Sequence, residues 1–323
     1  MKTVIIGNSG HVNYAFRGAE VNPDIKICSA APGIAEEDIG KLQGAVPVIY
    51  TDYKKMLDRE KPDIAVIASH FYINASIAIE CMNRGIHCFT EKPAAISFSD
   101  LDLLEKTQKS SGVKFCAMHA LRYEPAILAA HEAVKNGLIG IPWIINAQKS
   151  YKLGTRPDFF KKRSTYGGTI LWVGIHALDW IYWFSQSPVI EINAGHTAAG
   201  NSGFSEMESS CLIFLRMQNN AHASCSLDYF RPAGALTHDD DRLRIAGEKG
   251  IIEVREKNAL VLLHDQKPFN LPLSAERSIF SEFAESIAGE SKLLTGADEI
   301  FTVTRLALYA REAADKKQPV FIS

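Results

Sequence analysis

The first 120 residues alternate short apolar runs with amphipathic stretches, and this alternation limits the folds open to the chain more than any other feature. Apolar, strand-like runs occupy 3–7, 25–30, 46–50, 64–69, 86–92 and 113–118, and helical patterns lie between them at about 11–21, 35–42, 52–60, 74–85 and 98–112. Strands that alternate with helices predict βαβ units with right-handed crossovers. We therefore expect a doubly wound parallel sheet, a Rossmann domain, over residues 1–120.

After Met118 the pattern changes. A helix is expected at 125–137, a strand at 142–151, a basic loop at 152–168 and a helix at 169–184. Strand-like segments with hairpin turns at 217–221 and 247–250 fill most of 189–255, and two helices are expected near 277–289 and 296–315. This order predicts an α+β domain over 121–323, built on a largely antiparallel open sheet.

Composition excludes several classes of protein. The formal net charge of −2, with no block of like charges, does not favour a nucleic-acid partner. No apolar run approaches the roughly 18 residues that span a bilayer, and the apolar start is too short for a secretory signal. Six single cysteines without metal-ligand spacing are typical of a cytoplasmic protein with reduced thiols, so we expect that location and no metal site.

The first strand runs directly into a glycine turn, Gly7-Asn8-Ser9-Gly10-His11-Val12. Such a turn lets backbone N–H groups at a helix N-terminus approach a pyrophosphate, although G-x-x-G also suits a purely structural turn. The second strand should end near Ser29, where an acidic residue would hold the ribose of NAD. No acid or arginine stands there, and Glu36, Glu37 and Lys41 lie too far along to assign, so both NAD and NADP remain open.

Four further segments are similar to the glucose-fructose oxidoreductase / inositol dehydrogenase (Gfo/Idh/MocA) family. They are Glu91-Lys92-Pro93, YGGTILWVGIHALDW (166–180), HALRYEPAI (119–127) and GIIEV (250–254). The resemblance implies that Lys92 lies near the nicotinamide and contacts the substrate hydroxyl, that His176 is the acid/base, and that Asp179 lies in or beside a sugar pocket. It also adds cofactor contacts from the ends of the fourth and fifth strands: Ser69, His70, Asn74, Glu91 and Lys92.

Two positions depart from that family's pattern. Many of its sugar dehydrogenases carry an aspartate four residues before the histidine, where this chain has Trp172. The turn after the fourth strand, usually Pro-x-x-x-His, reads His70-Phe71-Tyr72-Ile73-Asn74.

In a regular helix over 169–184, Leu171, Ile175, Leu178 and Tyr182 form one stripe, and Trp172, His176, Asp179 and Trp183 form the neighbouring one. His176 and Asp179 would then interact on one face. A histidine suits proton transfer near neutral pH, and a lysine ammonium stabilises a developing alkoxide. Trp172 could stack on a sugar ring or only fill space.

Three further residues are candidates for substrate contact: Tyr123, Arg156 and His238. For Arg156 and His238 a solvated loop is an equally good interpretation, and for Tyr123 simple packing is. The run His238–Asp241 lacks the convergent geometry of a metal site.

Together these features predict an NAD(P)-dependent oxidoreductase that transfers a hydride between a nicotinamide and a secondary hydroxyl or keto group of a sugar, inositol or related polyol. Two alternatives stay open. The first is a lyase or glycosidase that retains NAD and uses transient oxidation, and the second is a non-catalytic dinucleotide or sugar sensor. An open sheet face predicts a homodimer or homotetramer formed through the C-terminal sheet, with no membrane partner.

Overall fold

The computed structural model describes residues 1–322, which form two compact units. The first contains 1–120, 164–167 and 277–304, and the second contains 121–163, 168–276 and 305–322. The division at residue 120 stays a prediction, and in the structure two later segments, 164–167 and 277–304, pack with the first unit.

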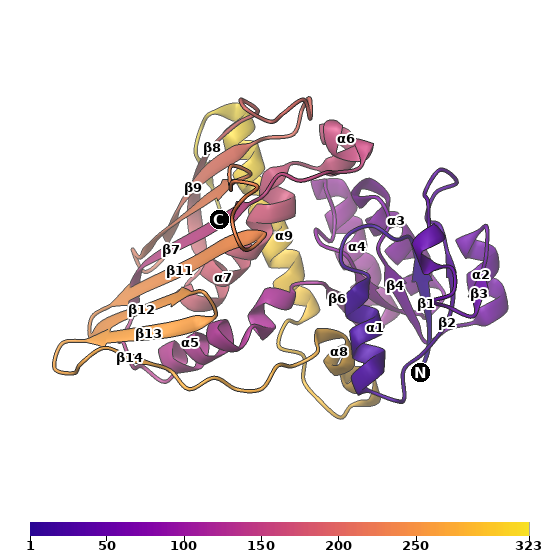
Figure 1. The fold of residues 1–323 in the computed structure, drawn as a ribbon, viewed down its shortest axis with the longest axis horizontal. Helices are drawn as coiled ribbons and strands as arrows, with labels where there is room; N and C mark the ends of the chain where they lie inside the picture. Colours follow the sequence, from indigo (N-terminus) through magenta and orange to yellow (C-terminus); the bar gives the residue numbers. More distant parts are fainter. Residues whose placement is uncertain (323) are drawn as a thin grey trace. The chain divides into compact units, whose positions relative to one another are not determined.

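The first unit is built on a parallel sheet of six strands in the order β3-β2-β1-β4-β5-β6 (Figure 1). The strands are β1 (Lys2–Ile6), β2 (Lys26–Ala31), β3 (Val48–Ile49), β4 (Ile64–Ile67), β5 (His87–Thr90) and β6 (Phe115–Ala117). The order reverses between β1 and β4, which is the doubly wound arrangement that the strand–helix alternation predicts. The Rossmann fold expected here is confirmed.

Five helices accompany this sheet: α1 (Asn13–Val21), α2 (Tyr53–Glu60), α3 (Phe71–Asn83), α4 (Phe98–Ser111) and α8 (Ile279–Ala288). The side chains of Asp52, Ser97 and Ser278 cap α2, α4 and α8. Helix α8 comes from the far end of the chain, and its Phe280 ring lies 4.9 Å from that of Phe89 in β5. The core of the first unit therefore includes a C-terminal segment.

The helix expected at 35–42 is wrong. Only a short 3₁₀ turn, η1 (Gly40–Leu42), forms there. The carboxylate of Glu37 is directed back to the glycine turn, where it accepts hydrogen bonds, so the loop before η1 is fixed by tertiary contacts and not by helical periodicity.

The second unit contains a nine-stranded sheet in the order β14-β13-β12-β11-β7-β10-β9-β8-β15. The strands are β7 (Pro142–Tyr151), β8 (Val189–Thr197), β9 (Ser210–Met217), β10 (His222–Asp228), β11 (Asp239–Gly247), β12 (Gly250–Arg255), β13 (Asn258–Leu263), β14 (Phe269–Asn270) and β15 (Val320–Phe321). The expected antiparallel character is confirmed except at the centre, where β7 and β10 are parallel. A helical segment and two strands separate β7 from β10 in the chain, which allows β10 to return in the same direction.

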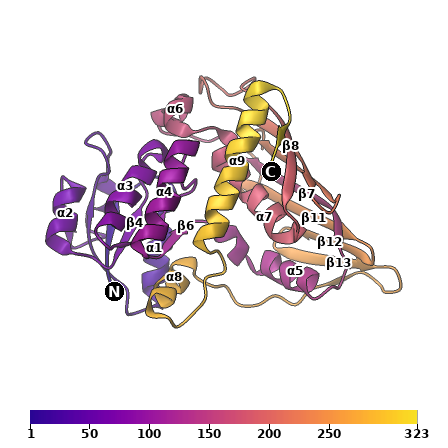
Figure 2. The ribbon, with the colours of Figure 1, turned by 180° about the vertical axis from the view of Figure 1, so that it is seen from behind.

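The helical elements of this unit are η2 (Ala120–Tyr123), α5 (Pro125–Lys135), η3 (Asp158–Lys161), η4 (Ile170–Gly174) and α7 (Ile175–Ser185). The short α6 (Arg163–Tyr166) precedes η4. Figure 2 shows α9 (Ala297–Lys316) as one continuous helix, whose residues to 304 belong to the first unit and the rest to the second.

Candidate functional site

The glycine turn follows β1 and adopts backbone angles that favour glycine. The φ angles of Gly7 and Gly10 are 84° and 78°. A Cβ on Gly7 would lie 2.5 Å from the Cα of Ser69, and one on Gly10 would lie 2.1 Å from Oε2 of Glu91. Both glycines are therefore required by close packing within the first unit.

The start of α1 fits the pyrophosphate of a dinucleotide. Among residues 1–322, no acceptor bonds the backbone N–H groups of Gly10, Val12 or Asn13. The first turn of α1 carries no acidic residue, so the positive end of the helix dipole is not neutralised locally. Unsatisfied N–H groups at a helix N-terminus are the arrangement that binds a phosphate.

Glu91 of the Glu-Lys-Pro motif ties β5 to this turn. Its fully buried carboxylate accepts the backbone N–H of His11, and His11 Nδ1 lies 3.1 Å away. Burial alone would raise the pKa of Glu91, but the His11 interactions and the charge of Lys92 bring that pKa below its usual value. Glu91 therefore stays ionised and holds the shape of the turn.

The other predicted cofactor residues lie at the ends of β2 and β4 or close to them. Ser29 is fully buried, and β2 continues to Ala31, so the strand ends two residues later than expected. Ser69 and Asn74 are also buried, and the Asn74 side-chain oxygen accepts the Ser69 N–H at 3.1 Å. His70 immediately precedes α3, and burial lowers its pKa.

Glu37, which lies too far along the chain to assign from the sequence, contacts this turn in the structure. Its carboxylate accepts the N–H groups of Asn8 and Gly33 at 3.1 and 3.0 Å. It also accepts the hydroxyls of Ser9 and Ser69, at 3.3 and 2.5 Å. Two features of the sequence could have indicated this role of Glu37. They are the lack of an acidic residue at the end of β2 and the Pro32-Gly33 turn, which redirects the chain.

Lys92 follows β5 and is buried, with its backbone N–H donated to Oε1 of Glu91 at 3.1 Å. It belongs to the first unit, whereas His176 and Asp179 belong to the second. The convergence of Lys92 with His176 on one substrate oxygen therefore stays a prediction.

The helix expected at 169–184 is present, but its first turn is wider than a regular α-helix. Residues Ile170–Gly174 form a π-helical turn, after which α7 runs regularly to Ser185. A π-turn rotates the residues within and before it around the helix axis. Trp172 therefore does not lie on the same stripe as His176, Asp179 and Trp183, as a regular α-helix would predict. Such turns occur often at functional sites.

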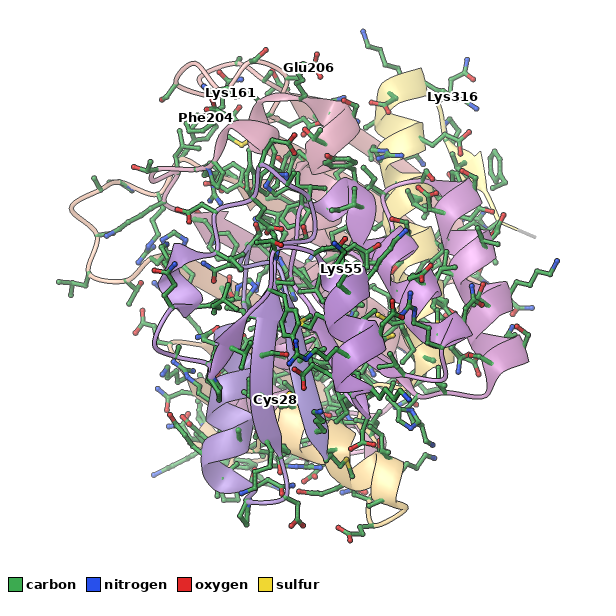
Figure 3. All side chains as sticks on the ribbon, turned by 90° about the vertical axis from the view of Figure 1, so that its right-hand side faces the viewer. Cys28, Lys55, Lys161, Phe204, Glu206 and Lys316 are labelled. Carbon is green, nitrogen blue, oxygen red and sulfur yellow. The ribbon has the colours of Figure 1, made fainter. Side chains whose placement is uncertain are left out.

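Glu208, which precedes β9, holds the start of this helical segment. One carboxylate oxygen accepts the Thr169 N–H at 2.8 Å, and the other pairs with Arg163. The neighbouring loop adds a bond from the Glu206 N–H to the Lys161 carbonyl at 3.1 Å, and both of these residues are labelled in Figure 3. No motif in the sequence pointed to Glu208.

Asp179 forms a buried ion pair with Arg122 of η2. Arg122 Nη2 lies 2.6 Å from Oδ1, and Nε lies 3.1 and 3.0 Å from the two carboxylate oxygens. Both side chains are almost completely buried. The Arg122 guanidinium also lies 4.9 Å from the centre of the Trp183 ring. The ion-pair partner of Asp179 therefore lies 57 residues earlier in the chain.

The remaining predicted substrate residues have aromatic neighbours or are buried. The Arg156 guanidinium lies 5.3 Å from the Phe160 ring and 4.5 Å from the Tyr229 ring. Trp172 meets Phe160 edge-on at 5.8 Å, so Phe160 links it to Arg156. His238 is exposed and stacks on Tyr151 with ring centroids 5.5 Å apart, and Tyr123 is buried in η2.

A cavity of about 520 Å³ lies in the second unit and contains none of the predicted substrate residues. Trp180, Asp241 and Glu124 line it. Behind it the fully buried Lys149 pairs with Asp241 and lies 4.2 Å from the Trp180 ring. The buried Trp180 Nε1 and one oxygen of Asp241 have no hydrogen-bond partner among the described residues.

Within residues 1–322, no group of three or more acidic, histidine or cysteine side chains is arranged to hold a metal ion. None of the described helices combines the length and apolar character needed to cross a bilayer. All six cysteines carry free thiols.

Comparisons with known proteins agree with the fold. Residues 26–119 match the model of an oxidoreductase family with an NAD-binding Rossmann fold, and residues 127–253 match the GFO/IDH/MocA C-terminal domain. The structure superposes on an oxidoreductase of Thermotoga maritima, named without a substrate, with a TM-score of 0.96, 42% identity and 100% coverage of both chains.

Two curated relatives have stated activities. A myo-inositol 2-dehydrogenase of Thermotoga maritima is 24% identical over 252 residues, which cover 76% of this chain and 72% of the relative. A 2,7-anhydro-N-acetylneuraminate hydratase of Mediterraneibacter gnavus is 23% identical over 209 residues, which cover 64% of this chain and only 54% of the hydratase.

The parallel sheet, the glycine turn and the N-terminal match define an NAD-binding oxidoreductase fold. With the C-terminal match and the 42% identical structure, the chain belongs to the Gfo/Idh/MocA family.

Proposed function

We propose that the protein is an NAD(P)-dependent oxidoreductase acting on a secondary hydroxyl or keto group of a sugar, inositol or related polyol. The main support for dinucleotide binding comes from the start of α1, where backbone N–H groups have no acceptor among the described residues. The glycine turn that precedes them holds these groups in place. The myo-inositol dehydrogenase relative supports the polyol class. A cytoplasmic location stays a prediction that rests on cysteine use.

The proposed chemistry needs a proton acceptor and a cation at one oxygen. A bound nicotinamide supplies the hydride acceptor at C4. His176 would take the hydroxyl proton of the substrate, and Lys92 would stabilise the charge that develops on the oxygen. Asp179 would support the protonated imidazole, and the buried ion pair with Arg122 holds that carboxylate in place.

We also propose that the outer face of the nine-stranded sheet joins a second copy of this chain. Ile144, Leu212 and Phe214 are exposed on that face, at 48%, 68% and 41% of their surface. A groove of about 1270 Å³ lies along it, and Leu212 and Phe214 line this groove together with Asn146, Gln148 and Ser224. An exposed apolar strip on a sheet with polar neighbours suits a symmetric contact.

The first experiment is a sugar and polyol panel with NAD and NADP supplied separately, scored by the absorbance of the reduced cofactor. Lys92→Met should lower kcat/KM at least about a hundredfold on any active substrate, because the oxyanion loses its cation. Lys55→Met, on the exposed surface of α2 (Figure 3), is the matched control and should change kcat/KM less than about twofold.

The hydratase relative favours one alternative, an enzyme that oxidises its substrate transiently and returns the hydride. This enzyme would also need Lys92, but would turn substrate over without net accumulation of reduced cofactor. Product analysis on the same panel distinguishes the two. Unchanged activity in the Lys92→Met variant would exclude both the dehydrogenase and the enzyme that uses transient oxidation.

A further inference from the structure

The carboxylate of Glu37 lies beside the carboxyl ends of β1, β2 and β4. Its partners come from three places: the glycine turn after β1 (Asn8 and Ser9), the loop after β2 (Gly33), and the residue after β4 (Ser69). These three strand ends surround the crevice at which the strand order reverses. Glu37 is 8% exposed, so the carboxylate is held inside the turn and not in solvent.

The charge of Glu37 is not neutralised by a neighbouring side chain. Within residues 1–322, no lysine, arginine or histidine forms an ion pair with it, and its four hydrogen-bond donors are uncharged. The half-buried His70 lies in the field of Glu37, but burial lowers the pKa of His70, which keeps that ring neutral near pH 7. The Glu37 carboxylate therefore has no countercharge among the described residues.

Two of the four donors are backbone groups and two are hydroxyls that can rotate. The N–H groups of Asn8 and Gly33 fix the orientation of the carboxylate. The Ser9 and Ser69 hydroxyls occupy its other lone pairs, and both can turn to other acceptors. Ribose hydroxyls offer the same kind of donor in their place.

We propose that Glu37 is the residue that selects NAD over NADP, by accepting the adenosine ribose hydroxyls and repelling a 2′-phosphate. The acid that the end of β2 lacks is thus supplied by the following loop, eight residues after Ser29. This inference rests on the proposed use of a dinucleotide, and adds to it which of the two cofactors is bound.

The test is the affinity of the unmodified protein for NAD and for NADP, measured separately by isothermal titration calorimetry without substrate. NAD should bind at least about tenfold more tightly, because hydrogen bonds to a charged acceptor are gained and repulsion is avoided. Glu37→Gln keeps the shape and removes the charge, and should reduce the ratio to about threefold or less. Glu36→Gln, at the exposed neighbouring position, should leave the ratio unchanged.

The outcomes separate this proposal from the proposed function. Preference of the native protein for NADP, or an unchanged ratio in Glu37→Gln, would overturn the role of Glu37 and leave the oxidoreductase standing. Failure of the native protein to bind either dinucleotide would overturn both.

A second measurement covers the case in which Glu37→Gln does not fold. The native protein is titrated with ADP-ribose and with its 2′-phosphorylated form at low and high salt. The phosphorylated form should bind more weakly, and the difference should narrow with salt, because screening weakens repulsion between like charges. Equal binding of the two forms at low salt would overturn the proposal.

Discussion

At the scale of single residues, the main finding is that Asp179 is held by a partner the sequence pattern did not suggest. A regular helix predicts His176 as its neighbour, whereas the structure places Arg122 of η2 against its carboxylate. The pair is buried, so each charge depends on the other for compensation. A residue proposed to support catalysis is therefore also part of the structural core of the second unit.

Removing one member of this pair should be costly. Asp179→Asn leaves a buried guanidinium without its countercharge, and we expect the free energy of unfolding to fall by about 3–5 kcal/mol. The double variant Arg122→Met/Asp179→Leu should regain most of that loss, because no buried charge remains. Urea unfolding followed by tryptophan fluorescence measures both variants. A loss below about 1 kcal/mol in Asp179→Asn would show that the buried Arg122–Asp179 pair does not have this role in stability.

At the scale of elements, the start of the helical segment 170–185 is determined by its surroundings. Glu208 binds the Thr169 N–H, and a Cβ on Gly174 would lie 2.7 Å from Leu227 of β10. Helix α7 packs on β7 and also touches α5, where the His131 ring stacks on Trp183 with centroids 3.5 Å apart. Proton uptake by His131 would therefore disturb a helix–helix contact.

This stacking predicts a pH dependence of stability. Burial, assisted by the charges of Arg122 and Lys135, lowers the pKa of His131 to about 4. Between the ordinary value near 6.5 and about 4, the unfolded chain binds a proton that the folded chain does not, so stability falls as pH decreases through this window.

We expect the Tm of the native protein to fall more between pH 7 and pH 5 than that of His131→Phe, which keeps the stacking without titrating. His264→Phe, at an exposed position, should behave like the native protein. Parallel thermal melts at the two pH values test this. The same decrease in all three proteins would rule out His131 as the cause.

At the scale of the whole molecule, the outer face of the nine-stranded sheet determines the expected assembly. Leu212 and Phe214 of β9 expose 68% and 41% of their surface on that face. Charges placed there would be buried unpaired in a sheet-to-sheet contact.

The double variant Leu212→Glu/Phe214→Glu should therefore lower the molar mass in solution from that of an oligomer to about 36 kDa, the mass of one chain. Size-exclusion chromatography with light scattering measures it. The exposed surface substitution Leu103→Glu, on α4, is the control and should leave the mass unchanged. An unchanged mass in the double variant would place the contact elsewhere.

Much of the fold could be predicted from the sequence because its main elements follow local periodicity. The parallel strands and the helices α2 to α5 repeat at regular spacing, and turns such as 217–221 have clear residue preferences. The site was only partly predictable. Glu37, Arg122 and Glu208 act through long-range contacts that no local pattern encodes, and the π-turn before His176 depends on packing against β10.

The position of α8 has a consequence for how this protein is made. Its Phe280 and Phe283 lie 4.9 and 5.7 Å from Phe89, and a Cβ on Gly18 of α1 would lie 2.8 Å from Phe280. During synthesis the N-terminal residues emerge from the ribosome first, but this apolar surface stays uncovered until residues 277–304 have been translated. Residues 1–120 alone are thus an incomplete folding unit, and a nascent or truncated chain that ends before α8 exposes a site for chaperone binding or aggregation.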